Sequence, residues 1–202
     1  MVEIPQQTLD LLFDNQVIAY PTSTLPGLAT LPTSQGLDAL FALKQRRSDQ
    51  PVSLGVASLE QAAQYVHVPH LAYRLLDGFD RGALTLILDA KQPMDERLGG
   101  ARVAVRVFAH PVAIAMANSV GPVTATSANR SGEVPKNRSE DAGRELGLSS
   151  TAVLEGNCPG GNGSTLVSLV KSEDSTTGYS VSIMREGVVP QSDVTEWMVK
   201  NH

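Results

Sequence analysis

The sequence has little cysteine, few aromatic residues and no long apolar run, and each scarcity excludes a class of protein. Cys158 is the single cysteine among 202 residues, so the chain can form neither an internal disulfide nor a Cys-x-x-Cys metal site. No apolar stretch approaches the roughly 20 residues that span a bilayer, and the first residues, MVEIPQQTLD, lack a basic segment followed by an apolar one. We therefore expect a cytoplasmic protein that makes no use of a membrane.

Positive charge is also scarce. The chain has 16 Lys and Arg residues against 21 Asp and Glu, which gives a net charge of -5. Because proteins that bind nucleic acid non-specifically are usually basic, any contact with RNA must use a local patch of cations. The length and the 42% of hydrophobic residues suit one sizeable core. We predict a single domain over residues 1–202.

Apolar residues recur at helical and strand spacings along the chain. Helices are predicted over residues 5–15, 34–47, 58–65, 69–76, 110–120, 139–146 and about 190–201, with Thr33 or Ser34 and Ser58 as candidate N-caps. Strands are predicted over residues 17–20, 52–58, 83–90, 102–108, 122–128, 151–156, 164–170 and 178–185. Since helices separate most of these strands, the order indicates an α/β fold with a sheet of mixed direction.

Four polar clusters follow predicted strands or helices, where open α/β sheets usually bind ligands. Thr22-Ser23-Thr24 follows the first strand, although a capped turn would explain it equally well. Lys44-Gln45-Arg46-Arg47 ends the second helix, where cations also suit the helix dipole. Lysine and arginine together nevertheless match a polyphosphate or a carboxylate.

The other two clusters lie in polar loops. TATSANRSG, residues 124–132, can present hydroxyls, an amide and backbone N–H groups to an anion. GGNGSTLVSL, residues 160–169, combines glycines with Ser164 and Thr165, and a glycine-rich hairpin is its simplest interpretation. The second of these loops is not a P-loop, because Gly-Lys-Ser/Thr is absent and a strand follows.

Two arginines lie on predicted strands. Alternation over residues 102–108 places three valines on one face and Arg102, Ala104 and Arg106 on the other. Arginine on a buried sheet needs an anionic partner, and Arg185 at the end of the strand 178–185 raises the same requirement. The sequence has neither Gly-x-Ser-x-Gly nor His-Glu-x-x-His, which argues against a nucleophile-elbow hydrolase and a zincin protease.

In order along the chain, seven segments resemble the signatures of the YrdC-like family, the threonylcarbamoyl-AMP synthases: YPTSTLPGL, LKQRRSDQP, GALTLIL, VAVRVFAHP, TSANRSG, GSTLVSL and MREG. The resemblance extends over about residues 5–188. It implies a single YrdC-like domain, with a twisted mixed sheet flanked by helices around a deep, positively lined cavity. It also implies that L-threonine, bicarbonate and ATP yield threonylcarbamoyl-AMP and pyrophosphate, with Mg²⁺ carried by the ATP phosphates and no metal ligand from the protein.

The resemblance also implies partners and residue roles. The product would serve the threonylcarbamoyladenosine modification of tRNA through a separate transferase complex, with weak binding of tRNA or double-stranded RNA as a further possibility. Lys44 and Arg46 match the family's catalytic, phosphate-binding residues. The threonine site is matched by Thr22, Thr24, Arg106 and Ser164, and the nucleotide site by Lys44, Arg46, Ser127, Asn129, Thr165 and Arg185.

The sequence departs from the family pattern beside the first cluster. Ser23 stands where an acidic residue is usual, and Pro26 replaces an aromatic residue that could close over the substrate. A second function therefore stays open: a diverged paralogue that acts as an RNA-binding, nucleotide-binding or regulatory module without efficient synthesis. The proposed chemistry needs no covalent nucleophile, so a site of hydroxyls, amides and cations agrees with it.

Overall fold

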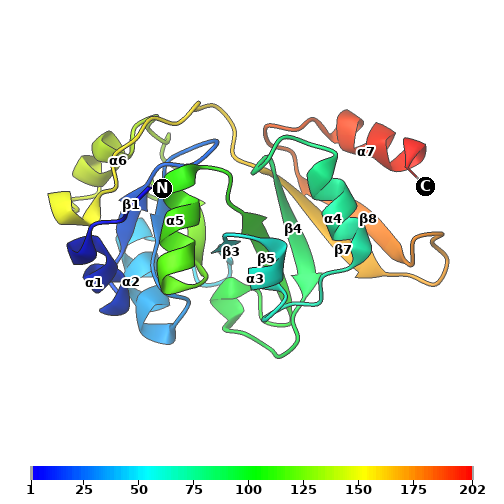
Figure 1. Ribbon diagram of the computed structural model, residues 1–202, viewed down its shortest axis with the longest axis horizontal. Helices are drawn as coiled ribbons and strands as arrows, with labels where there is room; N and C mark the ends of the chain where they lie inside the picture. Colours follow the sequence, from blue (N-terminus) through cyan, green and yellow to red (C-terminus); the bar gives the residue numbers. More distant parts are fainter. Residues whose placement is uncertain (1, 202) are drawn as a thin grey trace.

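One mixed sheet of eight strands runs through the molecule in the order β1-β2-β6-β3-β5-β4-β7-β8 (Figure 1). The computed structural model describes residues 2–201. The strands are β1 (Ile18–Tyr20), β2 (Gly27–Ala29), β3 (Ser53–Val56), β4 (Leu84–Asp89), β5 (Arg102–Val107), β6 (Val123–Ser127), β7 (Thr165–Lys171) and β8 (Tyr179–Arg185). Strand β3 is parallel to β5 and β4 to β7, whereas the other neighbours are antiparallel, which confirms the predicted mixed sheet.

Helices connect most of the strands. They are α1 (Gln6–Phe13), α2 (Ser34–Lys44), α3 (Leu59–Ala62), α4 (His70–Asp77), α5 (Pro111–Val120), α6 (Ser139–Glu145) and α7 (Gln191–Lys200), with short 3-10 turns η1 (Glu96–Leu98) and η2 (Ser150–Ala152). Two predicted caps are present, since the Thr33 and Ser58 hydroxyls accept hydrogen bonds from backbone N–H groups three residues on. None of the helices within residues 2–201 combines the length and the apolar character needed to cross a bilayer.

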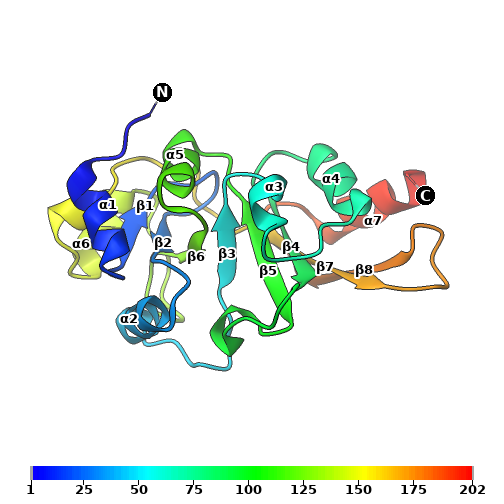
Figure 2. The ribbon, with the colours of Figure 1, turned by 60° about the horizontal axis from the view of Figure 1, so that its bottom comes forward.

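The helices cover the two halves of the sheet differently. Around β1, β2 and β6, α1 and α5 enclose one buried cluster and α2 and α6 enclose another. Beside β3, β5, β4 and β7, the helices α3, α4 and α7 build a third cluster. Figure 2 shows α3 and α4 on one side of these strands and α2 on the other side of the sheet, beyond β2 and β6. The face of β3, β5, β4 and β7 turned away from α4 is therefore free to line a cavity.

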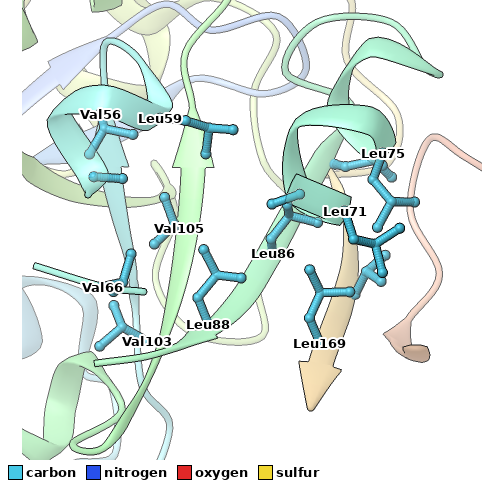
Figure 3. Close-up of a cluster of buried hydrophobic side chains, with 14 of the residues drawn as sticks. Val56, Leu59, Val66, Leu71, Leu75, Leu86, Leu88, Val103, Val105 and Leu169 are labelled. Atoms are coloured by element: carbon cyan, nitrogen blue, oxygen red, sulfur yellow. The ribbon is translucent and has the colours of Figure 1, made fainter. Parts of the chain in front are cut away.

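The core under α4 explains which side chains reach that open face. Figure 3 shows this cluster, which includes Leu71, Leu75, Leu86, Leu88, Val103, Val105 and Leu169. Each buried leucine contributes roughly 1.5–3 kcal/mol to stability. Because successive strand residues point to opposite faces, the residues between these leucines and valines, such as Thr85, Ala104 and Arg106, point away from the core.

Two segments differ from the sequence prediction. The predicted strand 151–156 is wrong: the chain forms η2 and then a single parallel bridge between Val153 and Ala19. This segment borders β1, which is only three residues long, so no ladder extends along it. Strand β2 was not predicted, because three consecutive buried residues show no alternation.

Two predicted helices are shorter than expected. Helix α2 ends at Lys44, since Gln45 adopts the left-handed conformation with φ of 50°. The helix after Ser58 ends at Ala62 and does not reach Tyr65. The remaining predicted elements are present, with ends that differ by one or two residues.

Candidate functional site

A cavity of about 500 Å³ lies on the open face of the sheet. Alternate residues of three strands form its floor: Thr85 and Ile87 from β4, Ala104 and Arg106 from β5, and Leu166 from β7. Six of the predicted site residues line it, namely Thr24, Arg46, Arg106, Ser127, Ser164 and Arg185. The fold therefore brings together residues that are far apart in the chain.

Arg106 is a cation in the cavity floor, and no carboxylate of residues 2–201 forms an ion pair with it. Its Nη2 donates hydrogen bonds to Thr24 Oγ1 at 2.7 Å and to the Gly82 carbonyl at 3.3 Å, and Thr22 Oγ1 lies 3.5 Å away. Burial lowers the pKa of its guanidinium. A partly buried cation held only by hydroxyls and a carbonyl is suited to receive an anionic ligand.

The loop between β1 and β2 supplies the hydroxyls that contact Arg106. Thr22 is buried, and its hydroxyl donates to the Leu25 carbonyl at 2.6 Å and accepts from the Thr24 N–H at 3.1 Å. Thr22 therefore shapes the turn that presents Thr24, and it does not itself line the cavity. Ser23 and Pro26, where the sequence departs from the family pattern, also lie outside the cavity lining.

Thr85 and Ser164 form a buried hydroxyl pair in the cavity wall, with 2.6 Å between their oxygen atoms. The Ser164 carbonyl also accepts a hydrogen bond from Arg185 Nη2 at 3.0 Å. Thr85 was not predicted as a site residue. Its position in the apolar run ALTLIL matched an ordinary β-branched strand residue, and only the pairing of β4 with β7 brings it to Ser164.

Arg46 and Arg185 add two further guanidinium groups to the lining. Arg46 donates to the backbone carbonyls of Gln50 at 2.7 Å and Pro51 at 3.0 Å. Burial, and then the charge of Arg185, lower the pKa of Arg46. Two cations that repel each other, with no carboxylate partner among residues 2–201, favour the binding of an anion between them.

Lys44 lies beneath the loop that follows β6 and does not line the cavity. Its Nζ donates hydrogen bonds to the carbonyls of Ser127 and, at 2.7 Å, of Asn129, and its own carbonyl accepts from the Ser131 N–H at 2.9 Å. Burial, and then the charge of Arg46, lower the pKa of Lys44 to about 8. Lys44 thus holds the loop that presents Ser127, and its contact with a phosphate stays a prediction.

Asn129 is turned into its own loop. Its Nδ2 donates to the carbonyls of Arg130 and Glu133, both at 2.8 Å, while Oδ1 is buried without a hydrogen-bond partner among residues 2–201. The amide therefore fixes the turn after Ser127, and its predicted contact with a nucleotide is not visible in the cavity lining.

Thr165 also faces away from the cavity. Its hydroxyl donates to the Val189 carbonyl at 2.6 Å and accepts from the N–H groups of Gly187 at 2.9 Å and Val189 at 3.1 Å. These contacts hold the segment after β8 against the start of β7. The geometry supports a positioning role for Thr165, and its contact with the nucleotide stays a prediction.

The cavity offers cations and hydroxyls and little negative charge. Glu186 is the one carboxylate among the described residues that line it, and its Oε2 accepts a hydrogen bond from the Gln191 N–H at 2.8 Å. Within residues 2–201, no group of three His, Cys, Asp or Glu side chains is arranged to hold a metal ion. The site is therefore suited to a ligand that carries several negative charges.

Comparisons with known proteins agree with this description. The protein-family model Sua5_yciO_yrdC, described as "Telomere recombination", matches residues 10–187. A threonylcarbamoyl-AMP synthase of Vibrio campbellii is 34% identical over 164 residues, which cover 78% of this chain and 89% of that protein. A threonylcarbamoyl-AMP synthase of Bacillus subtilis is 33% identical over 156 residues, which cover 74% of this chain and 45% of that protein.

Solved structures show the same fold. The crystal structure of P. abyssi Sua5 complexed with L-threonine matches with a TM-score of 0.83 at 22% identity, over 98% of this chain and 58% of that one. The structure of E. coli YciO matches with a TM-score of 0.72 at 21% identity, over 93% of this chain and 91% of that one. The chain thus corresponds to the whole of some relatives and to one part of longer ones.

Proposed function

The chain belongs to the Sua5/YciO/YrdC family, and from this premise we propose that it makes threonylcarbamoyl-AMP from L-threonine, bicarbonate and ATP, with release of pyrophosphate. The observation that carries the proposal is the cavity itself, in which Arg46, Arg106 and Arg185 meet without carboxylate partners among residues 2–201. An amino-acid carboxylate and a triphosphate together supply the negative charge that this cluster lacks.

We assign the Arg106 end of the cavity to threonine. The guanidinium would bind the substrate carboxylate, which places the amine near Thr24 and the Thr85–Ser164 hydroxyl pair. Hydroxyls can both donate and accept hydrogen bonds, so they can orient the amine before and after it is carboxylated. The relative of known structure that was crystallised with L-threonine supports the choice of amino acid.

We assign Arg46, Arg185 and Ser127 to the phosphates of ATP. The threonine amine forms a bond to the carbon of bicarbonate, one C–O bond of bicarbonate breaks, and the lost hydroxide leaves as water with a proton from the amine. An oxygen of the resulting carbamate then attacks the α-phosphorus, and the bond from that phosphorus to the bridging oxygen breaks as pyrophosphate leaves. Negative charge accumulates on the departing oxygens, and fixed cations stabilise it without reorganisation. Lys44 would act through the loop 127–131, whose carbonyls it holds.

Mg²⁺ belongs to the proposed reaction as a partner of the ATP phosphates, where it neutralises charge. The donor set of the cavity fits that arrangement, because its one described carboxylate, Glu186, already accepts a hydrogen bond from the Gln191 N–H. We assign no metal ligand to the protein. The transferase complex that would consume the product, and the modified tRNA, remain predictions from the resemblance.

Incubation of the protein with ATP, L-threonine, bicarbonate and Mg²⁺ tests the proposal. We expect threonine-dependent release of pyrophosphate, together with the adenylate in mass spectrometry. Failure to release pyrophosphate in the presence of threonine would refute the proposal. Binding of ATP without turnover would support instead the diverged, nucleotide-binding module.

Two neighbouring arginines provide a matched pair of variants. Arg46 lines the cavity, whereas Arg47 is exposed and paired with Asp49 at 2.6 Å. We expect Arg46→Ala to lower kcat/KM by about tenfold to a hundredfold, since hydrogen bonds to charged groups contribute about 1.5–3 kcal/mol. Arg47→Ala should leave it unchanged. Equal effects of the two substitutions would show that the phosphate assignment is wrong.

A further inference from the structure

The unpaired cations of this protein gather in two places. Of the 16 Lys and Arg side chains, seven form ion pairs with carboxylates of residues 2–201, which leaves nine. Lys44, Arg46, Arg106 and Arg185 belong to the cavity or to the loop beside it. Arg74, Lys91 and Lys171 form a second group, and Arg81 and Arg130 belong to neither.

The sheet topology brings the second group together. Strands β4 and β7 are parallel, so they end at the same end of the sheet, with Lys171 closing β7 and Lys91 two residues beyond β4. The chain near His67 runs beside them, because the His67 N–H donates to the Asp89 carbonyl and the Lys91 N–H to the Tyr65 carbonyl, both at 2.8 Å. His67, Lys91 and Lys171 line one groove of about 400 Å³.

A second groove of about 430 Å³ adjoins the first at Pro69 and Tyr179. His70 and Arg74 line it, and no described carboxylate lines either groove. Arg74 donates to the Asn201 carbonyl at 2.7 Å and lies over the Trp197 ring, so, within residues 2–201, Lys91 and Lys171 are the cations without such contacts.

Acidic side chains border the grooves: Glu60 is hydrogen-bonded to Tyr73, and Glu173 follows Lys171 by two residues. Asp174 of the β7–β8 turn lines a separate depression. The chain as a whole has a net charge of -5, whereas the side chains that line the two grooves include cations and no described carboxylate.

Two tyrosines lie among these cations. Tyr73 lines the first groove and is 36% exposed, and Tyr179, which lines both, pairs with Lys171 in the register of β7 and β8. Figure 1 shows α4 and the β7–β8 turn at the same end of the molecule. Tyr73 is exposed and Tyr179 is half-buried against the core. Cations beside accessible aromatic rings suit single-stranded nucleic acid, since phosphates pair with the cations and bases stack on the rings.

We propose that these two joined grooves bind a single-stranded segment of nucleic acid, with phosphates at Lys91 and Lys171 and bases on Tyr73 and Tyr179. The inference does not depend on the proposed reaction. The grooves include Val66, Leu71 and Tyr179, which belong to or pack on the core under α4, whereas the cavity opens on the opposite face of the sheet. A strand in the grooves would leave the cavity accessible.

Fluorescence anisotropy with a labelled oligouridylate, titrated at several salt concentrations, tests the proposal. The double variant Lys91→Glu/Lys171→Glu should bind at least about tenfold more weakly. Its plot of log affinity against log salt concentration should be shallower by roughly 1.4, at about 0.7 for each lost phosphate contact. Tyr73→Leu should weaken binding about fivefold or more without changing that slope, because stacking releases no counter-ions.

Lys136→Glu/Lys200→Glu is the matched control, since it changes the net charge equally at lysines that are ion-paired elsewhere. Equal weakening by the two double variants would overturn the proposal, and so would an oligouridylate that fails to bind the wild type at low salt. Loss of binding in Arg185→Ala with none in the groove variant would place the strand in the cavity instead. The double variant Lys91→Gln/Lys171→Gln removes both positive charges without adding negative ones, so it should also bind more weakly than the wild type, but by a smaller factor. Binding as tight as that of the wild type would contradict the assignment of phosphates to these lysines.

Discussion

Replacing Lys44 by methionine should remove a pH-dependent part of the stability of this protein. The unfolded chain carries a lysine with a pKa of 10.5, whereas burial and Arg46 lower the pKa to about 8 in the folded state. Between these values the unfolded state binds more protons, so the free energy of unfolding of the wild type should rise with pH. At about 1.4 kcal/mol for each pH unit, the contribution of Lys44 grows by roughly 3 kcal/mol across the interval.

Urea denaturation of the wild type and of Lys44→Met, from neutral pH to about pH 10, measures this contribution. Every other ionisable group is common to both proteins, so the difference between the two free energies of unfolding isolates Lys44. We expect that difference to shift in favour of the wild type by about 2–3 kcal/mol as the pH rises. A difference that stays constant with pH would refute the buried ammonium and its role beneath the loop 127–131.

Three further substitutions test other parts of the structure. Thr85→Val should raise the KM for threonine about five- to thirtyfold, because Ser164 loses its hydrogen-bond partner at 2.6 Å, whereas Thr85→Ser should stay near the wild type. Steady-state release of pyrophosphate measures both variants. Equal losses in the two would contradict the role of the Thr85 hydroxyl in the threonine site. Tyr20→Phe should stabilise the protein by about 1 kcal/mol in thermal denaturation, since the buried Tyr20 hydroxyl has no partner among residues 2–201; a loss of stability would reveal one. Thr165→Val should cost about 2–3 kcal/mol of stability, because two backbone N–H groups lose their acceptor, and Thr165→Ser should recover most of it in the same measurement.

Much of the candidate site could be predicted because its residues sit in short polar motifs at the ends of strands. Thr24, Ser127 and Ser164 follow or precede apolar runs, and all three line the cavity. The alternation over residues 102–108 correctly separates Arg106 from the core valines. These patterns depend only on residues that are close together in the sequence, so they can be recognised without knowledge of the three-dimensional structure.

Side chains that act at a distance could not be assigned in this way. Thr85 meets Ser164 across 79 residues of sequence, and Lys44 meets the Ser127 carbonyl across 83. Thr165 is next to the cavity residue Ser164 in the sequence, but its hydroxyl donates and accepts hydrogen bonds outside the cavity, and its contact with a nucleotide stays a prediction. A motif identifies residue types, whereas the direction of each hydroxyl is set by the strand against which it packs.

The amino-acid sequence was enough to predict the α/β class, nearly all of the helices and strands, and the chemical character of the site. Each of these depends on local periodicity, on capping or on residue type. The position of the cavity could not be predicted in this way, because it depends on helices α3, α4 and α7 covering one face of β3, β5, β4 and β7 and leaving the other face free. The two separate groups of unpaired cations also depend on the tertiary fold, since the strand order places Lys91 beside Lys171 and keeps both on the far side of the sheet from Arg106.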